Sequence, residues 1–215
     1  MPLRSRLTQA AVVVIVLTAA KRASVRWGVT DAEVQRTLPG DELIPSAGIV
    51  MDRACTLECT TAQAYPWLVQ LGKGRAGWYL PLWVDRALIP VDRRAARHID
   101  PALQDLAPGD RVPDWGRGNP ELEVISLDPP GSLVFVTRRG SVTASWTLQL
   151  EDAEPGRCRL HARLRANHLS RRMPVLVGTA AGLFDLLTLL GLFAGLRERV
   201  SGAVPAPTAA PRHSR

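Results

Sequence analysis

Few residues in this sequence have the types and the spacing that catalysis or metal binding requires. No His-x-x-x-His pair occurs, and no carboxylate stands at ligand spacing beside two histidines, so we expect no metal site and no cofactor. The Gly-x-Ser-x-Gly turn of many hydrolases is also absent. His161 falls on the arginine-bearing side of its strand, which predicts a solvated side chain. Any two aspartates in the middle of the chain could act as acid and base, although turn and cap roles are the simpler interpretation.

The segment Gly72-Lys-Gly-Arg-Ala-Gly77 matches the phosphate-binding pattern G-x-G-x-x-G in letters only. A dinucleotide-binding loop follows a strand and opens a helix, whereas this one follows a predicted helix and soon meets Pro81, which interrupts any helix. We therefore interpret the segment as a flexible loop, in which Gly72, Gly74 and Gly77 supply conformational freedom.

Tryptophan is over-represented among the aromatic residues, with six tryptophans beside two tyrosines and three phenylalanines. Such rings either fill a core or line an apolar pocket. We predict that Trp78, Tyr79 and Trp83 contact a ligand at the entrance of a cavity, with the glycine loop as its gate. Trp146 is predicted to line the same cavity from the sheet. Ordinary core packing of these rings is the alternative.

The three cysteines, Cys55, Cys59 and Cys158, cannot all pair within one chain and lack the spacing of a zinc site. Free buried thiols in a reducing compartment are the favoured interpretation, with one disulfide and one free thiol as the alternative. On this ground the cytoplasmic side of a membrane is slightly favoured for the folded domain.

The chain is basic, with 27 lysines and arginines against 20 aspartates and glutamates and a formal net charge of +7. The arginines are spread over strands, loops and tail and form no single block, which argues against nucleic acid as a partner and favours an anionic membrane. At 46% hydrophobic and 22% charged residues, the composition is that of a globular chain and excludes collagen-like, disulfide-rich and wholly disordered classes.

The N-terminus has the pattern of a membrane-directed segment. Leu7 to Ala20 carries no charge and is flanked by basic residues on both sides. About fourteen helical residues span roughly 21 Å, less than the roughly 30 Å hydrocarbon core, so the segment suits a short anchor or a signal sequence. The pair Lys21-Arg22 directly after small residues disfavours cleavage. We predict that residues 1–23 anchor the chain in the cytoplasmic membrane, with a signal peptide and an apolar soluble N-terminus as alternatives.

Apolar residues that alternate with a period of two predict strands in the middle of the chain. Val142 to Leu150 and Cys158 to Ala166 show this alternation, and the loop between them makes a hairpin. Together with shorter strands they form an antiparallel meander with one dry and one wet face. Helices are expected at Thr61 to Leu71, with Pro66 as a kink or a delayed start, and at Leu82 to Leu88. The shorter strands are expected at Val50 to Leu57, Arg111 to Asp114, Leu122 to Leu127 and Leu133 to Thr137.

Met173 to Leu196 is a long apolar stretch in which Asp185 is the only ionisable group. It is long enough to cross a bilayer, but small and polar residues recur at helical spacing along one side. That pattern favours a helix packed within the domain, with a membrane span as the alternative. Residues 200–215 are rich in proline and alanine and are expected to be disordered.

The order of strand, helices, antiparallel strands and long final helix predicts an α+β helix-grip fold over residues 27–199. In this fold an antiparallel sheet wraps around the C-terminal helix, and here a hydrophobic segment precedes it. Separately from this element order, five blocks of the sequence are similar to those of a known family: Arg26-Trp-Gly-Val-Thr-Asp-Ala-Glu33, Leu38-Pro-Gly-Asp41, Tyr65-Pro-Trp-Leu-Val-Gln-Leu-Gly72, Gly74-Arg-Ala-Gly-Trp-Tyr79 and Leu103-Gln-Asp-Leu-Ala-Pro-Gly-Asp110.

These blocks resemble an actinobacterial branch of the SRPBCC, or START-like, superfamily, and the resemblance covers roughly residues 26–166. It implies a helix-grip domain that encloses an apolar cavity. Members bind lipids, hormones or polyketides, and some are cyclases or aromatase-like enzymes. No catalytic residues are shared across the superfamily, so none is transferred to this chain. The C-terminal helix departs from the family in carrying less charge.

Two functions of different classes follow. The favoured one is non-enzymatic binding of a hydrophobic small molecule or lipid in an internal cavity, with the domain tethered to the membrane through Leu7 to Ala20. The alternative is a polyketide cyclase or dehydratase-like enzyme that acts on an apolar substrate. A buried acid, base or histidine inside the cavity would favour the enzyme, and an apolar lining with one or two hydroxyls would favour the binder.

Overall fold

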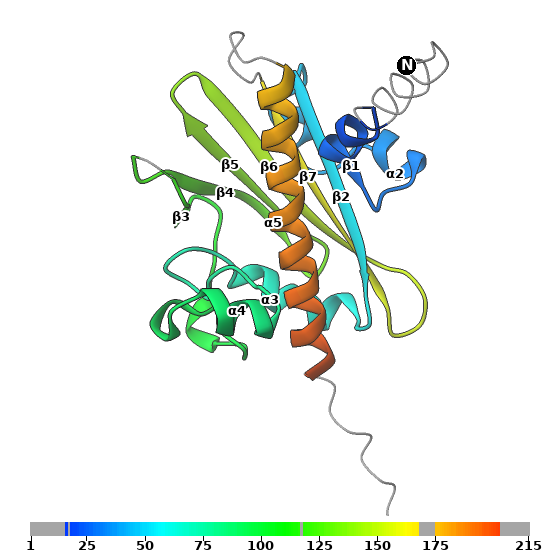
Figure 1. The fold of residues 1–215 in the computed structure, drawn as a ribbon. Coiled ribbons are helices and arrows are strands. Elements are labelled where there is room, and N and C mark those ends of the chain that lie inside the picture. The colour runs from blue at the N-terminus through cyan, green and yellow to red at the C-terminus, as the bar shows by residue number, and fades with distance from the viewer. Residues whose placement is uncertain (1–15, 17, 117, 168–174, 203–215) are drawn as a thin grey trace, which may run out of the picture.

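The chain folds around one seven-stranded sheet in a computed structural model, which describes residues 16, 18–116, 118–167 and 175–202. In Figure 1 the long helix α5 (Val175–Gly202) crosses one face of this sheet, and the shorter helices α3 (Thr61–Val69) and α4 (Leu82–Leu88) lie at one end of it. The strands are β1 (Arg26–Trp27), β2 (Ile49–Leu57), β3 (Arg111–Pro113), β4 (Glu121–Asp128), β5 (Ser132–Arg139), β6 (Val142–Asp152) and β7 (Cys158–Ala166). The remaining elements are the helix α2 (Asp31–Gln35) and the single 3-10 turns η1 (Asp41–Leu43), η2 (Val91–Arg93) and η3 (Pro101–Leu103).

The strands stand in the order β1-β2-β7-β6-β5-β4-β3, and all neighbours are antiparallel except β1 and β2. Strands β3 to β7 form the predicted meander, and β2 extends it beside β7. The register sets Trp146 opposite both Phe135 and Leu164, so these three side chains share the face that α5 covers. The two-residue alternation therefore predicted the strands and their dry face correctly.

Helix α5 packs on the sheet and completes the predicted helix-grip fold. Its inner side contributes Leu192, Phe193 and Leu196 to the core, each at most 1% exposed, whereas Phe184 is 70% exposed on its outer side. The part Thr179–Ser201 is long and apolar enough to cross a membrane, but the core helix of a soluble protein can have the same length and composition. Because the inner side is buried against the sheet, we assign this stretch to the domain.

Helix α3 has Thr60 as its N-cap, directly before the predicted first residue Thr61. The Thr60 hydroxyl accepts a hydrogen bond from the Gln63 N–H, and the Gln63 side chain accepts one from the Thr60 N–H, which makes a capping box. Pro66 therefore lies inside the helix, and a delayed start is the wrong alternative. The helix ends two residues before the predicted Leu71, since Gln70 serves as its C-cap.

The face of the sheet opposite α5 is covered by residues 28–45, here called the N-terminal cover, so the predicted wet face is wrong along β7. Arg163 is 2% exposed and donates to the carbonyl oxygens of Glu33, Val34 and Arg36 and to the Asp41 carboxylate. The prediction of a solvated His161 is also wrong, because this residue is 1% exposed and its Nε2 lies 2.8 Å from the Asp52 carboxylate, which also accepts a hydrogen bond from Arg163. Alternation identified the polar face but gave no information about what lies on it.

The chain enters the domain through a helical segment, residues 18–25. Ser24 is 3% exposed, and its carbonyl oxygen accepts a hydrogen bond from the Arg53 guanidinium at 2.8 Å. Contact between this last turn and β2 ties the segment to the sheet. Most of Leu7 to Ala20 and the tail after residue 202 lie outside the described residues, so the anchor and the disordered tail stay predictions.

Candidate ligand-binding cavity

A cavity of about 460 Å³ lies between the sheet and α5, within the roughly 300–1,000 Å³ range of small-molecule sites. Space remains there because small side chains face one another: Ala144 and Ala166 on the sheet, and Ala181 on α5. Strands β2 to β7 and the helix all contribute to its wall. The rest of the apolar lining consists of Ile49, Met51, Leu71, Trp78, Val112, Pro113, Trp115, Leu122, Phe135, Val142, Trp146, Leu164 and Leu189.

Four aromatic rings form a continuous row along one wall. Phe135 and Trp146, paired across β5 and β6, have centroids 5.8 Å apart. Trp146 is stacked with Trp78 at 6.1 Å, and Trp78 meets Trp115 edge to face at 5.9 Å. The Trp78 indole N–H is bound to the Thr188 carbonyl of α5 at 3.2 Å, which fixes this ring between sheet and helix. Rings in such a row offer a large, rigid apolar surface to a ligand.

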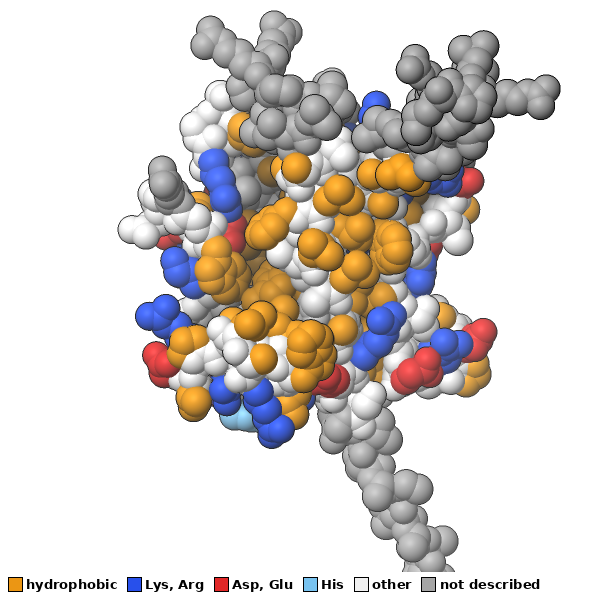
Figure 2. Space-filling view, viewed as in Figure 1, with side chains coloured by type: hydrophobic (Ala, Val, Ile, Leu, Met, Phe, Trp, Pro, Cys, Tyr) orange, Lys and Arg blue, Asp and Glu red, His pale blue; other side chains and the backbone are white. Residues whose placement is uncertain are grey.

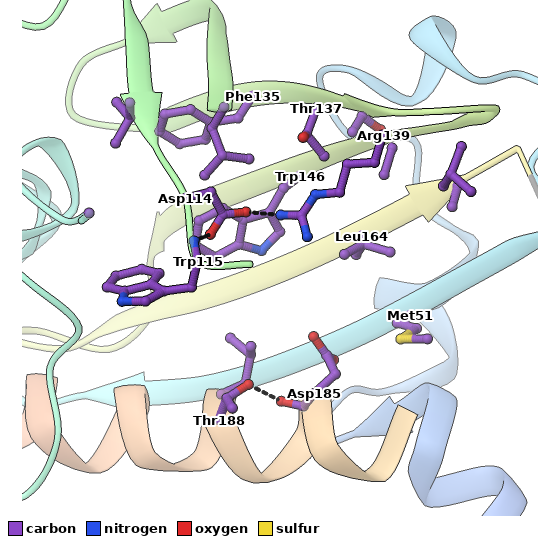
Figure 3. A pocket seen from close by; sticks show the side chains of 18 of the residues that line it. Met51, Asp114, Trp115, Phe135, Thr137, Arg139, Trp146, Leu164, Asp185 and Thr188 are labelled. Carbon is purple, nitrogen blue, oxygen red and sulfur yellow. Dashed lines mark hydrogen bonds and ion pairs between the residues drawn. The ribbon is translucent and has the colours of Figure 1, made fainter. Parts of the chain in front are cut away.

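The mouth of the cavity carries charge. Asp114, at the end of β3, and Arg139, at the end of β5, form an ion pair that lines the cavity (Figure 3). Trp115 stands beside this pair and is 45% exposed. Figure 2 shows the surface hollowed next to α5, with hydrophobic side chains inside the hollow. The partly exposed rim of the cavity thus carries a paired aspartate and arginine.

The interior holds one further ionisable group, Asp185 of α5, which points from the helix toward the sheet (Figure 3). Its carboxylate lies 3.3 Å from the Arg53 guanidinium, and the two side chains are 27% and 2% exposed. Burial raises the pKa of Asp185, and the Arg53 charge offsets that rise only in part. The cavity thus combines an apolar wall with a carboxyl group that is partly open to a ligand.

A hydroxyl group lines the sheet side of the same cavity. Thr137 of β5 lines the wall, and its Oγ1 is buried without a hydrogen-bond partner among the described residues. Thr188 of α5 also lines the cavity, but its hydroxyl already donates to the Asp185 carbonyl at 2.8 Å. Asp185 and Thr137 are therefore interior side chains that could bind a polar atom of a ligand.

The structure brings together only half of the predicted ligand contacts. Trp78 and Trp146 line the cavity, stacked on each other. Tyr79 does not, because its side chain points into the core, is 0% exposed and donates its hydroxyl to the Trp67 carbonyl at 2.8 Å. Trp83 is 70% exposed on α4 and does not line the cavity either. The side chains of residues 78 and 79 point in opposite directions. Closeness to Trp78 in the sequence therefore did not predict which other rings line the cavity.

The predicted gate loop is held by backbone hydrogen bonds within the loop and by close packing against its neighbours. Gly72 and Gly77 exchange backbone hydrogen bonds at 3.2 and 3.0 Å. A Cβ at Gly72 would meet Val112 at 2.5 Å, and one at Gly77 would meet Ala95 at 3.0 Å, so both glycines allow close packing. Gly74, at the tip, has a φ of +72° and no atom within 4 Å of a Cβ position. Of the three glycines, Gly72 lines the cavity. The role of the loop as a gate stays a prediction.

The site residues that sequence reasoning missed include Asp185, Arg53 and Trp115. A clue to Asp185 was present, because it is the one ionisable residue in the apolar stretch that forms α5. Arg53 had no such clue, since its position within a strand does not show that it reaches a helix more than a hundred residues later. Elsewhere in the described ranges, no group of three histidine, cysteine, aspartate or glutamate side chains could hold a metal ion.

Comparison with known proteins found similarity in structure alone. No protein-family model and no curated protein matches the chain. A START superfamily protein from Mycobacterium smegmatis is 9% identical with a TM-score of 0.43, covering 72% of this chain and 99% of its own. CalU16 from Micromonospora echinospora is 16% identical with a TM-score of 0.41, covering 78% and 90%. An HSP90 activator from Plasmodium falciparum is 13% identical with a TM-score of 0.41, covering 67% and 97%.

Likeness at this level says nothing about what this chain binds, and the helix-grip architecture follows from the strand order, the register and the packing of α5. The actinobacterial branch stays an expectation.

Proposed function

We propose that this protein binds a hydrophobic small molecule or lipid in the cavity between the sheet and α5, without chemical conversion. The observation that supports this most directly is the apolar cavity of about 460 Å³ with its row of stacked rings. Transfer of apolar ligand surface from water to such a wall contributes roughly 25 cal/mol per Å². A fixed aromatic wall also lowers the cost of ordering side chains on binding.

Binding can be tested with Nile red, an uncharged dye that fluoresces in apolar surroundings. We expect saturable binding to the full chain, and binding about fivefold or more weaker in Trp78→Leu, because one large apolar contact is worth about 1–3 kcal/mol. Trp83→Leu is the matched control, since it removes a ring that does not line the cavity, and its affinity should equal that of the unchanged chain. Circular dichroism establishes that both variants keep their fold.

Absence of saturable dye binding, or an equal loss of affinity in the two folded variants, would overturn the proposal. Native mass spectrometry of the purified protein supplies a second measurement. A co-purified apolar molecule that is retained by Trp83→Leu and lost from Trp78→Leu would support the cavity as its site.

The membrane tether is a second part of this proposal. The segment Leu7 to Ala20 is uncharged, and the helical residues 18–25 that follow it enter the domain beside α5. The outer side of that helix exposes Phe184 and Leu187, at 70% and 68%. Figure 2 shows hydrophobic side chains gathered over α5 on this face. An anchor at this position would hold the exposed apolar side chains of α5 near the bilayer. Interfacial helices bind membranes through such apolar side chains.

Membrane fractionation tests the tether in the full chain. We expect the unchanged chain in the membrane fraction, and Val14→Asp in the soluble fraction, because a charge at the centre of the run disfavours insertion. Glu154→Asp, a conservative change in the loop between β6 and β7, should leave the distribution unchanged. Recovery of the unchanged chain in the soluble fraction would refute the tether.

A catalytic role is the second candidate, and one observation favours it: Asp185 is a half-buried carboxyl group with a raised pKa inside the cavity. A cyclase or dehydratase-like reaction would use it as acid or base. Among the described lining residues its ionisable companions are Asp114 and Arg139, which are paired with each other at the mouth. The interior therefore offers one such group, which supports binding over acid–base chemistry.

A further inference from the structure

Asp185 gives the cavity a way to select its ligand, and this inference rests on the proposed binding function. We propose that the Asp185 carboxylate accepts a hydrogen bond from a neutral hydroxyl group, so that the preferred ligand is an apolar alcohol. The geometry of the pair formed by Asp185 and Arg53 supplies the reasons, in three steps.

The first step is free acceptor capacity. Among the described residues, Arg53 is the partner of the Asp185 carboxylate, through one contact of 3.3 Å between Oδ2 and Nη2. An ionised carboxylate offers about four lone-pair positions on two oxygens. Its side chain remains 27% exposed and opens into the cavity, while Arg53 is 2% exposed behind it. A ligand can therefore reach the carboxylate but not the guanidinium.

The second step is charge balance. Arg53 is held in place by the carbonyl oxygens of Ser24, Asp52 and Gly182, at 2.8, 3.0 and 3.3 Å. Its positive charge compensates the negative charge of Asp185. An ammonium ligand would add an uncompensated positive charge to this buried site, and a carboxylate ligand would oppose Asp185, both of which are costly in an apolar cavity. A hydroxyl group donates a hydrogen bond without changing the balance.

The third step concerns the surroundings. The Thr188 hydroxyl, one turn along α5, is engaged with the Asp185 backbone carbonyl and so does not occupy the carboxylate. Met51 and Leu164 line the sheet opposite the helix at this point and bring no strong donor (Figure 3). A donor for the free lone pairs must therefore come from the ligand or from water. An alcohol satisfies them while its chain or ring covers the apolar wall.

The test is displacement of Nile red by matched twelve-carbon probes. We expect 1-dodecanol to displace the dye at a concentration about tenfold or more below that of 1-methoxydodecane, which has the same chain but no donor. Dodecylamine and dodecanoate should also be weaker than the alcohol. In Asp185→Leu the alcohol and the ether should become equal within about twofold, and in Thr137→Val on the opposite wall the preference for the alcohol should persist.

Removal of Asp185 alone leaves Arg53 buried without its partner, so a second variant removes both charges. Asp185→Leu with Arg53→Met replaces the pair by apolar side chains of similar size, and it should bind the dye with the preference for the alcohol abolished. If the dye binds and the alcohol and ether displace it equally from the unchanged chain, the inference is wrong and the proposed function survives. If the preference disappears in Thr137→Val, the hydroxyl is recognised by β5 and the inference is also wrong. If the dye does not bind at all, the proposed function itself fails.

Discussion

The backbone of Ser24 occupies the place where a side chain on Gly182 would begin. A Cβ built on Gly182 would lie 2.5 Å from the Ser24 carbonyl oxygen. The same oxygen accepts the hydrogen bond from Arg53, which in turn contacts Asp185. One glycine in α5 thus sets the position of the entering chain, of the buried arginine and, through it, of the carboxylate in the cavity.

Gly182→Ala should lower the free energy of unfolding by about 1–3 kcal/mol, because backbone must move to relieve the overlap. Gly191→Ala is the matched control on the same helix. Its Cβ would meet the far end of the flexible Leu80 side chain at 2.9 Å, so the gain in helix propensity should offset the contact. Chemical denaturation followed by circular dichroism measures both. Equal stability of the two variants would show that the Ser24 contact does not constrain α5.

The C-terminal half of α5 is fixed by a buried arginine. Arg199 is 3% exposed, lies 3.7 Å from the Asp85 carboxylate and donates to the carbonyl oxygens of Ala96 and Leu80. Arg199→Met should destabilise the fold by about 3–5 kcal/mol, because Asp85 would stay buried without its counter-charge. Adding Asp85→Asn should recover part of this loss.

Chemical denaturation of the single and double variants checks this prediction, with Arg197→Met on the exposed side of the same turn as the control. A double variant no more stable than the single one would contradict the role given to Asp85. The carbonyl groups that lose Arg199 as a donor account for the part that is not recovered.

The N-terminal cover should loosen in acid. Arg159 binds the Glu33 carboxylate through Nε and Nη2 at 2.7 and 3.0 Å, and this hydrogen bonding lowers the pKa of Glu33 from 4.5 to about 2. Because the folded pKa is the lower one, the stabilising effect is complete above about pH 5 and is lost as the pH falls from 4.5 toward 2. Glu33→Gln should therefore have a lower Tm than the unchanged chain near neutral pH, and the difference should shrink over that range.

Thermal unfolding at several pH values measures this difference. Glu154→Gln removes an exposed partner of Arg157 and should lower the Tm little at any pH, since exposed pairs contribute little. A Tm difference for Glu33→Gln that stays constant down to about pH 2 would disprove the assignment.

The cysteine thiols should be unreactive in the folded protein. Cys55, Cys59 and Cys158 are free and at most 5% exposed. Burial raises the pKa of Cys55 to about 12, so its nucleophilic thiolate is scarce near neutral pH. Mass spectrometry after iodoacetamide treatment at about pH 8 should show an unmodified native chain and three modifications in concentrated guanidinium. Rapid modification of the native chain would contradict this burial.

The elements of the fold could be predicted from the sequence because each depends on local patterns. Strand β7 was predicted with the bounds Cys158–Ala166 that the structure has, and α4 with Leu82–Leu88. Trp146 was placed on the dry face by alternation alone. The failures concern what lies across space: His161 was expected in water and lies beneath the cover, and Tyr79 was expected in the cavity and lies in the core. Local pattern gives the direction of a side chain relative to its own strand or helix, but not the segment that it meets.

By itself, the sequence determined the periodic strands, the helices α3 and α4, the apolar C-terminal helix and their order, and hence the α+β helix-grip class. Tertiary structure alone decided that Arg53 of β2 meets Asp185 of α5 and that Trp78 stacks on Trp146. It also decided that small residues on facing walls leave a cavity between sheet and helix. The physical reason is that burial and pairing of charge depend on contacts between residues far apart in the chain, which no local spacing records.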